Sequence, residues 1–184
     1  MLRHLPNTLT ALRLLCAPML AALLLSGYDR AALGVFAFAG LSDAADGFLA
    51  KRLGFSTHFG RYLDPAADKL LMLAAFLSLA TIHASPVWLT VLVILRDGAI
   101  VSAIGLAHVI GLPLRVEPLP IGKASTAAQV GFVALLLIAR AAGIEIPAVV
   151  RIAVMITAAF TVTSGIAYAI LWLKAFATRY RRAT

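Results

Sequence analysis

Four aspartates stand close together in an otherwise apolar sequence, and their type and spacing suit chemistry. They are Asp43, Asp46, Asp64 and Asp68. The first two are three residues apart and the last two are four apart, so each pair falls on one face of a helix. Carboxylates that converge in a partly buried cavity repel one another, so they either take up protons or bind cations. Hard divalent ions prefer oxygen ligands, and the pattern therefore predicts a site for one or two Mg²⁺ or Mn²⁺ ions.

Small residues share these two faces. Gly47 and Ala50 follow Asp43 at helical spacing, and Gly60 precedes Asp64 at helical spacing. They would leave room for a nucleotide beside the metal ions, which could bridge a diphosphate during an in-line displacement. Alternatively, they only allow the helices to approach closely, as small residues do in membranes.

The elements that must position these residues follow from the composition. The chain has 184 residues, of which 62% are hydrophobic and 13% charged, and its mean hydropathy is +0.97. Soluble domains are about 45–50% apolar and about 25% charged. A chain this short cannot hide such an excess inside, and a helical span takes about 20 apolar residues. We expect an all-α integral membrane protein with six transmembrane helices, forming one domain over residues 1–184.

Hydropathy and turn residues place the six expected helices. They cover residues 8–26, 31–52, 61–82, 86–110, 121–142 and 148–176. The loop between the second and third helices is short, so these two can run antiparallel with their aspartates facing each other. Residues 1–7 could form a short interfacial helix that Pro6 ends.

Lysines and arginines gather on one side of this expected topology. Six spans put both termini on the side that also holds the loops after the second and fourth helices. That side has twelve Lys and Arg residues against three on the other, with Arg96 inside the fourth helix. Positive charge favours the cytoplasmic side and anionic headgroups, which accounts for the net charge of +8 without a nucleic-acid partner. We expect both termini to be cytoplasmic.

The compartment is a further expectation. The N-terminus shows no cleavable signal peptide and is too short for a mitochondrial transit peptide. This favours the inner membrane of a bacterium, or a mature form. The single cysteine, Cys16, excludes an intrachain disulfide and a Cys-rich metal site.

The aspartates belong to a longer pattern. Asp43-x-x-Asp46-Gly47-x-x-Ala50-Lys51, eight residues, and Gly60-x-x-x-Asp64-x-x-x-Asp68 resemble the CDP-alcohol phosphotransferase signature, D-x2-D-G-x2-A-R-x8-G-x3-D-x3-D. One position departs from it, because Lys51 stands where arginine is usual. The charge is kept, but the planar bidentate guanidinium is lost. Arg52 follows and could replace it, so either residue could contact the pyrophosphate.

The resemblance implies an enzyme of phospholipid biosynthesis. Such proteins are six-helix membrane enzymes, usually homodimers, in which an alcohol attacks the lipid-linked phosphorus of CDP-diacylglycerol and CMP leaves. By position, it implies that all four aspartates bind metal and that Asp68 also deprotonates the acceptor hydroxyl. The residues that it implies for the CDP site are Ser42, Gly47, Ala50, Lys51 and Gly60.

Other segments bear on the acceptor alcohol. Residues 5–13 resemble the opening of both phosphatidylglycerophosphate synthases and cardiolipin synthases. Residues 32–41, Asp97 after Arg96, and Ser125 in place of a second lysine favour the cardiolipin branch. Its acceptor, phosphatidylglycerol, is a monoanionic diester, which suits a pocket with one cation fewer. The alternative acceptor is glycerol 3-phosphate, a dianionic monoester.

The resemblance places Arg96 and Lys123 in the acceptor pocket. Alternatively, Arg96 forms a structural ion pair, for which Asp97 is not the expected partner because adjacent helix residues point apart. Lys123 could instead be an interfacial lysine that reaches for the membrane surface. Arg13, near the start of the first helix, either touches the diphosphate or only anchors that helix.

Two other classes also fit an apolar chain with clustered acids. A small cation transporter often contains repeats and binds near the bilayer midplane. This sequence has no repeat, and its acids lie toward one side. A purely structural membrane protein does not need four intramembrane aspartates, which are costly there. The sequence therefore favours the enzyme.

Overall fold

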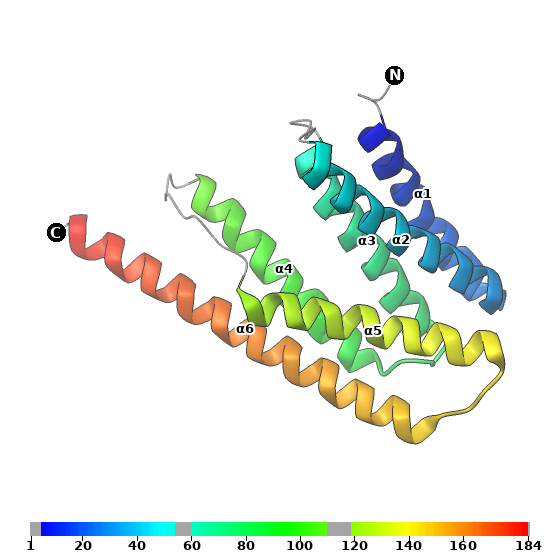
Figure 1. The fold of residues 1–184 in the computed structure, drawn as a ribbon. Coiled ribbons are helices and arrows are strands. Elements are labelled where there is room, and N and C mark those ends of the chain that lie inside the picture. Colours follow the sequence, from blue (N-terminus) through cyan, green and yellow to red (C-terminus); the bar gives the residue numbers. More distant parts are fainter. Residues whose placement is uncertain (1–4, 54–59, 110–118, 184) are drawn as a thin grey trace. The chain divides into compact units, whose positions relative to one another are not determined.

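The computed structural model describes residues 5–53, 60–109 and 119–183, and side chains within 12–43, 67–107, 109 and 119–174. Every regular element in these described ranges is an α-helix, and they contain no strand (Figure 1). The prediction of an all-α protein with six helices is confirmed.

The helix bounds follow the turn residues closely. The six are α1 (Leu5–Leu25), α2 (Asp29–Leu53), α3 (Gly60–Thr81), α4 (Val87–Val109), α5 (Pro120–Ala142) and α6 (Pro147–Ala183). Each bound lies within three residues of its predicted place, except that α6 runs on past residue 176. The prediction that Pro6 ends a short helix over residues 1–7 is wrong, because α1 runs through Pro6, whereas residues 1–4 lie outside the described residues. Pro6 lies in the first turn of α1, where its missing N–H is tolerated.

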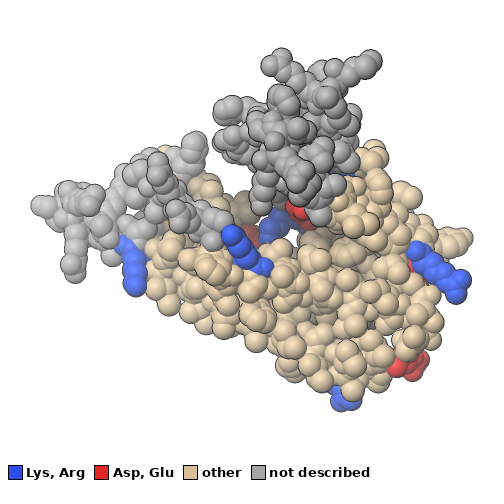
Figure 2. All heavy atoms as spheres, in the orientation of Figure 1, with Lys and Arg blue, Asp and Glu red and all other residues tan. Residues whose placement is uncertain are grey.

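Three segments are long and apolar enough to cross a membrane. They are Val87–Ala107, Pro120–Ala142 and Pro147–Lys174, and Leu12–Leu25 forms a shorter apolar helix in the part of the chain considered. Large apolar side chains lie on the outside, such as Leu41 and Leu173, each at least 70% exposed. In Figure 2, most of the described atoms in view belong to uncharged residues. The protein is therefore a multi-pass membrane protein, and spans in α1 to α3 stay predictions.

The helices form two compact units. Unit 1 comprises residues 1–86 and 133–146, and unit 2 comprises residues 87–132 and 147–184. In unit 1, α1 packs against both α2 and α3 (Figure 1). Leu20 and Leu24 of α1 and Phe76 and Leu79 of α3 are fully buried there. Since α2 and α3 carry the aspartate motif, α1 is the helix that both motif helices share as a neighbour.

The start of α2 is tied to the end of α5 within unit 1. Gly27, with φ +78°, makes the tight turn before α2 in a conformation that favours glycine. Arg140 donates to both carboxylate oxygens of Asp29, at 2.7 and 3.1 Å, and Arg30 donates to the Ala141 carbonyl at 3.2 Å. A carboxylate at a helix start and a guanidinium near a helix end also suit the two helix dipoles. These hydrogen bonds fix the end of α2 that lies away from the aspartate motif.

Unit 2 joins α4 and α6 to the first part of α5. Ala107 of α4 packs with Tyr168 and Trp172 of α6, and Leu119 lies against this cluster. Buried polar side chains lie along α6 as well, including Thr161 and Ser164, both fully buried. Hydrogen bonds between helices therefore contribute to this unit, as is common where lipid replaces water.

Candidate functional site

Arg13 of α1 joins the two ends of the aspartate motif. Its Nη1 lies 3.0 Å from Oδ1 of Asp43 on α2 and 3.0 Å from Oδ1 of Asp68 on α3. The two carboxylate oxygens therefore lie within twice that distance of each other. Two residues that are 25 positions apart in the sequence are thus brought to one guanidinium.

Burial differs sharply across this cluster. The Arg13 side chain is 1% exposed, whereas those of Asp43 and Asp68 are 52% and 46% exposed. A buried guanidinium is costly unless it is paired and hydrogen-bonded, so the two carboxylates stabilise it. In these contacts one guanidinium meets two carboxylates, and both carboxylates are partly open to solvent.

The other motif residues lie on the same two helices. Asp46, Gly47, Ala50 and Lys51 are in α2, and Gly60 and Asp64 are in α3, with side chains outside the described set. Ser42, half-buried, immediately precedes Asp43. Within the described side chains, no three His, Cys, Asp or Glu residues form a metal-ligating group. The side chains of Asp46 and Asp64 lie outside the described set, so the absence of a metal-ligating group does not extend to them.

The described donors nevertheless fit a hard divalent cation. Carboxylate oxygens are its preferred ligands, and Mg²⁺ binds them at about 2.1 Å. Asp43 and Asp68 supply such oxygens from two helices, close together and half exposed. The guanidinium of Arg13 already attracts two of these oxygens. A bound cation would therefore share its ligands with Arg13.

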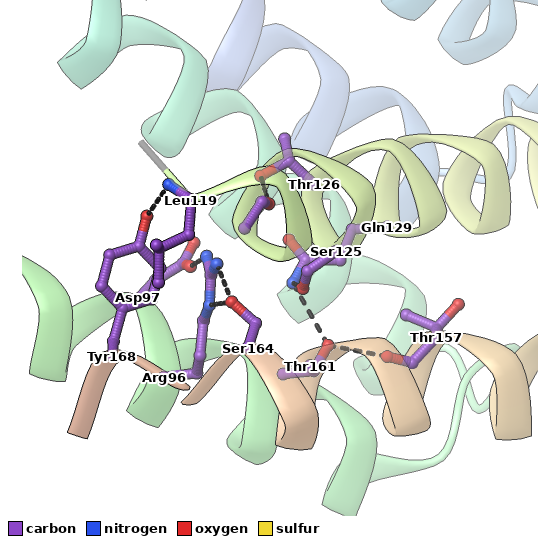
Figure 3. Close-up of polar contacts among 11 residues, drawn as sticks. Arg96, Asp97, Leu119, Ser125, Thr126, Gln129, Thr157, Thr161, Ser164 and Tyr168 are labelled. Carbon is purple, nitrogen blue, oxygen red and sulfur yellow. Dashed lines mark hydrogen bonds and ion pairs between the residues drawn. The ribbon is translucent and has the colours of Figure 1, made fainter. Parts of the chain in front are cut away.

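A second polar cluster lies in unit 2 and centres on Arg96 of α4, which is 8% exposed (Figure 3). Its Nε donates to Ser164 Oγ at 3.2 Å, and its Nη2 donates to the same oxygen. Its Nη1 donates to Asp97 Oδ1 at 2.7 Å. The expectation that Asp97 is not the partner is therefore wrong. The two Cβ atoms diverge on the helix, but the arginine side chain is long enough to turn back.

Lys123 belongs to the same unit as Arg96. It is exposed and follows Gly122 in the first turns of α5. A Cβ on Gly122 would lie 3.4 Å from Arg96 Nη2, so the guanidinium approaches this part of the α5 backbone closely. The two residues predicted to bind the acceptor thus belong to one region of unit 2.

Ser125 lies inside unit 2 rather than on a surface. It is fully buried, and its hydroxyl accepts from Gln129 Nε2 at 3.5 Å. Gln129 Nε2 also donates to Thr161 Oγ1 on α6 at 3.3 Å. A lysine at position 125 would place an ammonium at this buried position, which is costly unless a charged group or ligand pairs with it. The part of Ser125 in the choice of acceptor stays a prediction.

Sequence reasoning missed the roles of three residues. The sequence predicts that Arg13 touches the diphosphate or anchors a helix, but it does not predict the ion pairs with Asp43 and Asp68. Ser164 and Tyr168 were not singled out. They continue a series with Thr157 and Thr161 at positions i, i+4, i+7 and i+11, which marks one face of α6.

The chain is similar to known proteins over nearly its whole length. Residues 3–177 match the CDP-alcohol phosphatidyltransferase family. A cardiolipin synthase (CMP-forming) of Rattus norvegicus is 36% identical over 145 residues, 70% of this chain and 48% of that protein. A CDP-diacylglycerol–glycerol-3-phosphate 3-phosphatidyltransferase of Bacillus subtilis is 32% identical over 151 residues, 73% of this chain and 77% of that protein.

A protein of Pseudomonas fluorescens that bears the same name as the Bacillus protein is 42% identical over 106 residues. The match covers 55% of this chain and 54% of that protein. The chain therefore spans about half the length of the rat and Pseudomonas relatives. Relatives with both acceptor names occur at comparable identity, so similarity alone does not distinguish the two acceptors.

Replacing Arg13 tests the cluster in unit 1. Arg13→Gln should lower the free energy of unfolding by about 1–3 kcal/mol, because the two carboxylates lose their shared positive charge. Mg²⁺ should then restore more stability to Arg13→Gln than it adds to the wild type, since the ion takes the place of that charge. Thermal unfolding in detergent, with and without Mg²⁺, measures both effects.

The matched control for this experiment is Arg140→Gln, which removes the guanidinium bound to Asp29 in the same unit. It should lose stability without gaining a response to Mg²⁺. An equal Mg²⁺ response in the two variants would show that Asp43 and Asp68 do not attract the ion.

Proposed function

The chain belongs to the CDP-alcohol phosphatidyltransferase family, and from this premise we propose that it transfers the phosphatidyl group of CDP-diacylglycerol to an alcohol. CMP is the leaving group. The observation that carries the proposal is the meeting of Asp43 and Asp68, the first and last aspartates of the motif, at Arg13. A cation transporter would not need this motif, and a structural protein would not need its four acids.

The four motif aspartates would hold one or two Mg²⁺ or Mn²⁺ ions. Such an ion, when bound, supplies positive charge beside the diphosphate. Asp43 and Asp68 offer half-exposed carboxylates from α2 and α3, and Asp46 and Asp64 lie one helical turn away on the same helices. Arg13 holds Asp43 and Asp68 in place from the buried side.

The CDP group would lie along the same two helices. Gly47, Ala50 and Gly60 would leave space for it, and Ser42 would lie beside it. Lys51 supplies a positive charge where the family pattern has arginine. Either Lys51 or Arg52 would contact the diphosphate, since the two are adjacent and carry the same charge.

Asp68 would act as the general base. It accepts the proton of the acceptor hydroxyl while the hydroxyl oxygen forms a bond to the lipid-linked phosphorus. The bond from that phosphorus to the oxygen of CMP breaks in the same displacement. Because Arg13 fixes one oxygen of Asp68, the carboxylate keeps a defined orientation. The chain's contribution is thus position and charge, with one proton acceptor.

Phosphatidylglycerol is the acceptor we propose, which would make the product cardiolipin. Arg96 and Lys123 would contact its headgroup. The ion pair of Arg96 with Asp97 is neutral as a whole, and this supports a monoanionic diester over a dianionic monoester. The second candidate is glycerol 3-phosphate, which the names of the Bacillus and Pseudomonas relatives favour.

The remaining proposals concern organisation. Residues 1–184 would act as one membrane domain, as a homodimer in the inner membrane of a bacterium. Both termini and the loop after α2 would face the cytoplasm, because the predicted six-span topology puts twelve Lys and Arg residues on that side and three on the other.

Removing one motif carboxylate should abolish transfer. Asp46→Asn and Asp64→Asn should each lower CMP release by at least about 100-fold, because an amide is a weak ligand for a hard cation. Asp68→Asn should be equally inactive but lose less metal affinity than Asp46→Asn if it acts mainly as the base. CMP release and metal titration of purified protein measure these effects, and a near-wild-type rate for Asp46→Asn would refute the metal assignment.

The acceptor is tested by product analysis. Purified protein with CDP-diacylglycerol should give cardiolipin from phosphatidylglycerol in preference to phosphatidylglycerophosphate from glycerol 3-phosphate. Asp97→Asn should shift the ratio of the two kcat/KM values toward glycerol 3-phosphate by about 10-fold, because the negative charge that offsets Arg96 is then removed. Phosphatidylglycerophosphate as the only product would show that the acceptor is wrong, whereas the transfer reaction would stand.

Accessibility labelling tests the orientation. In a Cys16→Ser background, single cysteines at positions 56 and 180 should react with a membrane-impermeant reagent only after the cells are broken. The physical reason is the positive charge near both positions. A cysteine at position 144, between α5 and α6, should react in intact cells and serves as the control. Labelling of position 56 or 180 in intact cells would contradict the predicted cytoplasmic orientation of these segments.

A further inference from the structure

We propose that Ser164 and Tyr168 are positioning residues that hold the guanidinium of Arg96 for an anionic acceptor headgroup. We further infer that their arrangement requires glycine at position 122. The inference rests on the proposed function, in which Arg96 contacts the acceptor. All of these residues belong to unit 2, and Figure 3 shows Arg96, Ser164 and Tyr168 together.

Ser164 determines how the guanidinium is oriented. Its hydroxyl oxygen accepts two of the five N–H donors of Arg96, from Nε and Nη2, which lie on one edge of the guanidinium. Asp97 takes a third donor, from Nη1. Since three bonds from two directions fix a planar group, the guanidinium has one orientation. Ser164 is fully buried, so the hydroxyl cannot be replaced by water without a change in packing.

The donor count distinguishes a binding role from a purely structural one. Ser164 and Asp97 use three N–H donors, which leaves two that these bonds do not engage. An arginine that serves only as a scaffold in an apolar environment is stabilised by satisfying every donor. Arg96 thus has hydrogen-bonding capacity for a further oxygen ligand. A phosphate oxygen is a ligand that a fixed, planar guanidinium binds well.

Tyr168 links Arg96 to the start of α5. The guanidinium carbon lies 5.7 Å from the centre of the Tyr168 ring, within the range of a cation–π interaction. The Tyr168 hydroxyl accepts from the Leu119 backbone N–H at 3.3 Å. Leu119 immediately precedes α5 and is four residues before Lys123. One buried aromatic residue therefore sets both Arg96 and the helix start that carries Lys123.

Gly122 provides the space that this contact needs. A Cβ at position 122 would lie 2.9 Å from Tyr168 Oη and 3.4 Å from Arg96 Nη2. Tyr168 cannot withdraw easily, because it packs in the buried cluster with Ala107 and Trp172. An alanine at position 122 should therefore displace the Tyr168 hydroxyl and the guanidinium while every hydrogen-bonding group is kept.

The rest of α6 keeps Ser164 turned toward Arg96. Thr157, Thr161 and Ser164 share one face of α6 with Tyr168. Thr161 accepts from Gln129 of α5, and the Thr157 hydroxyl donates to the Ala128 carbonyl at 3.5 Å. These two contacts oppose rotation of α6 against α5. Where lipid surrounds the helices, such polar contacts and close packing replace the hydrophobic effect in fixing helix rotation.

The kinetic test separates acceptor binding from the chemical step. CMP release is measured with CDP-diacylglycerol saturating and phosphatidylglycerol varied, and then with glycerol 3-phosphate varied. Ser164→Ala should raise KM for the preferred acceptor by about 10-fold and change kcat by less than about 3-fold, the effect of losing hydrogen bonds to a charged group. Ser164→Thr should recover most of the loss because it keeps the hydroxyl. Gly122→Ala should resemble Ser164→Ala.

The control is Thr163→Ala on the same helix. Its hydroxyl is exposed and donates only to carbonyls of its own helix, those of Ala159 and Phe160. It should leave KM and kcat near the wild-type values. A KM for Ser164→Ala equal to that of Thr163→Ala, for both acceptors, would overturn the positioning role.

A second measurement does not depend on activity. Phenylglyoxal modifies accessible guanidinium groups, and mass spectrometry of the peptide that contains Arg96 gives its modification rate. The rate should be low in the wild type and in Thr163→Ala, and several-fold higher in Ser164→Ala and Gly122→Ala. An unchanged rate in Ser164→Ala overturns the positioning role even if the enzyme is active. The wild type could release no CMP with any acceptor while Arg96 is modified faster in Ser164→Ala. That result overturns the proposed function but supports the positioning of Arg96 by Ser164.

Discussion

A charge within apolar helices must be neutralised where it lies, and this constraint governs both units. Burying an unpaired ion costs several kcal/mol, whereas a paired and hydrogen-bonded ion costs far less. Arg13 is paired with carboxylates from two other helices, and Arg96 with a carboxylate and a hydroxyl. Arg140 is paired with Asp29 at the far end of α2. Each of these contacts also holds two helices together or orients a side chain. The same contact therefore neutralises a charge and positions a group.

The balance of charge within each cluster decides what it attracts. Arg13 meets two half-exposed carboxylates, and in the proposed function these carboxylates also bind a cation. Arg96 meets one carboxylate and one neutral hydroxyl among the described side chains, and in the proposed function it also meets an anionic headgroup. Such a cluster suits an oxygen ligand of low charge. In the proposed function, two arginines in similar apolar surroundings would therefore serve opposite kinds of ligand, and the difference would lie in the number of acids bound to each.

The helices followed from the sequence because hydropathy and turn residues act locally. The end of α6 did not, because the basic segment after residue 176 lacks the apolar signal yet remains helical. The pairing of Arg96 with Asp97 was missed because helix geometry fixes Cβ atoms and leaves a long side chain free to turn back. The burial of Ser125 depends on which face α6 covers, and the pattern of α5 alone does not contain that information.

Small and polar residues, rather than large apolar ones, determine the precise geometry in unit 2. Apolar side chains face lipid as readily as they face another helix, so they fix helix rotation weakly. Hydroxyl groups on one face of α6 have specific partners on α4 and α5, and only one rotation of α6 satisfies them together. Gly122 adds a close approach that no other residue allows without displacing Tyr168 or Arg96. The proposed transfer, in which a headgroup meets a fixed guanidinium, would therefore depend on residues that carry no charge and perform no chemistry themselves.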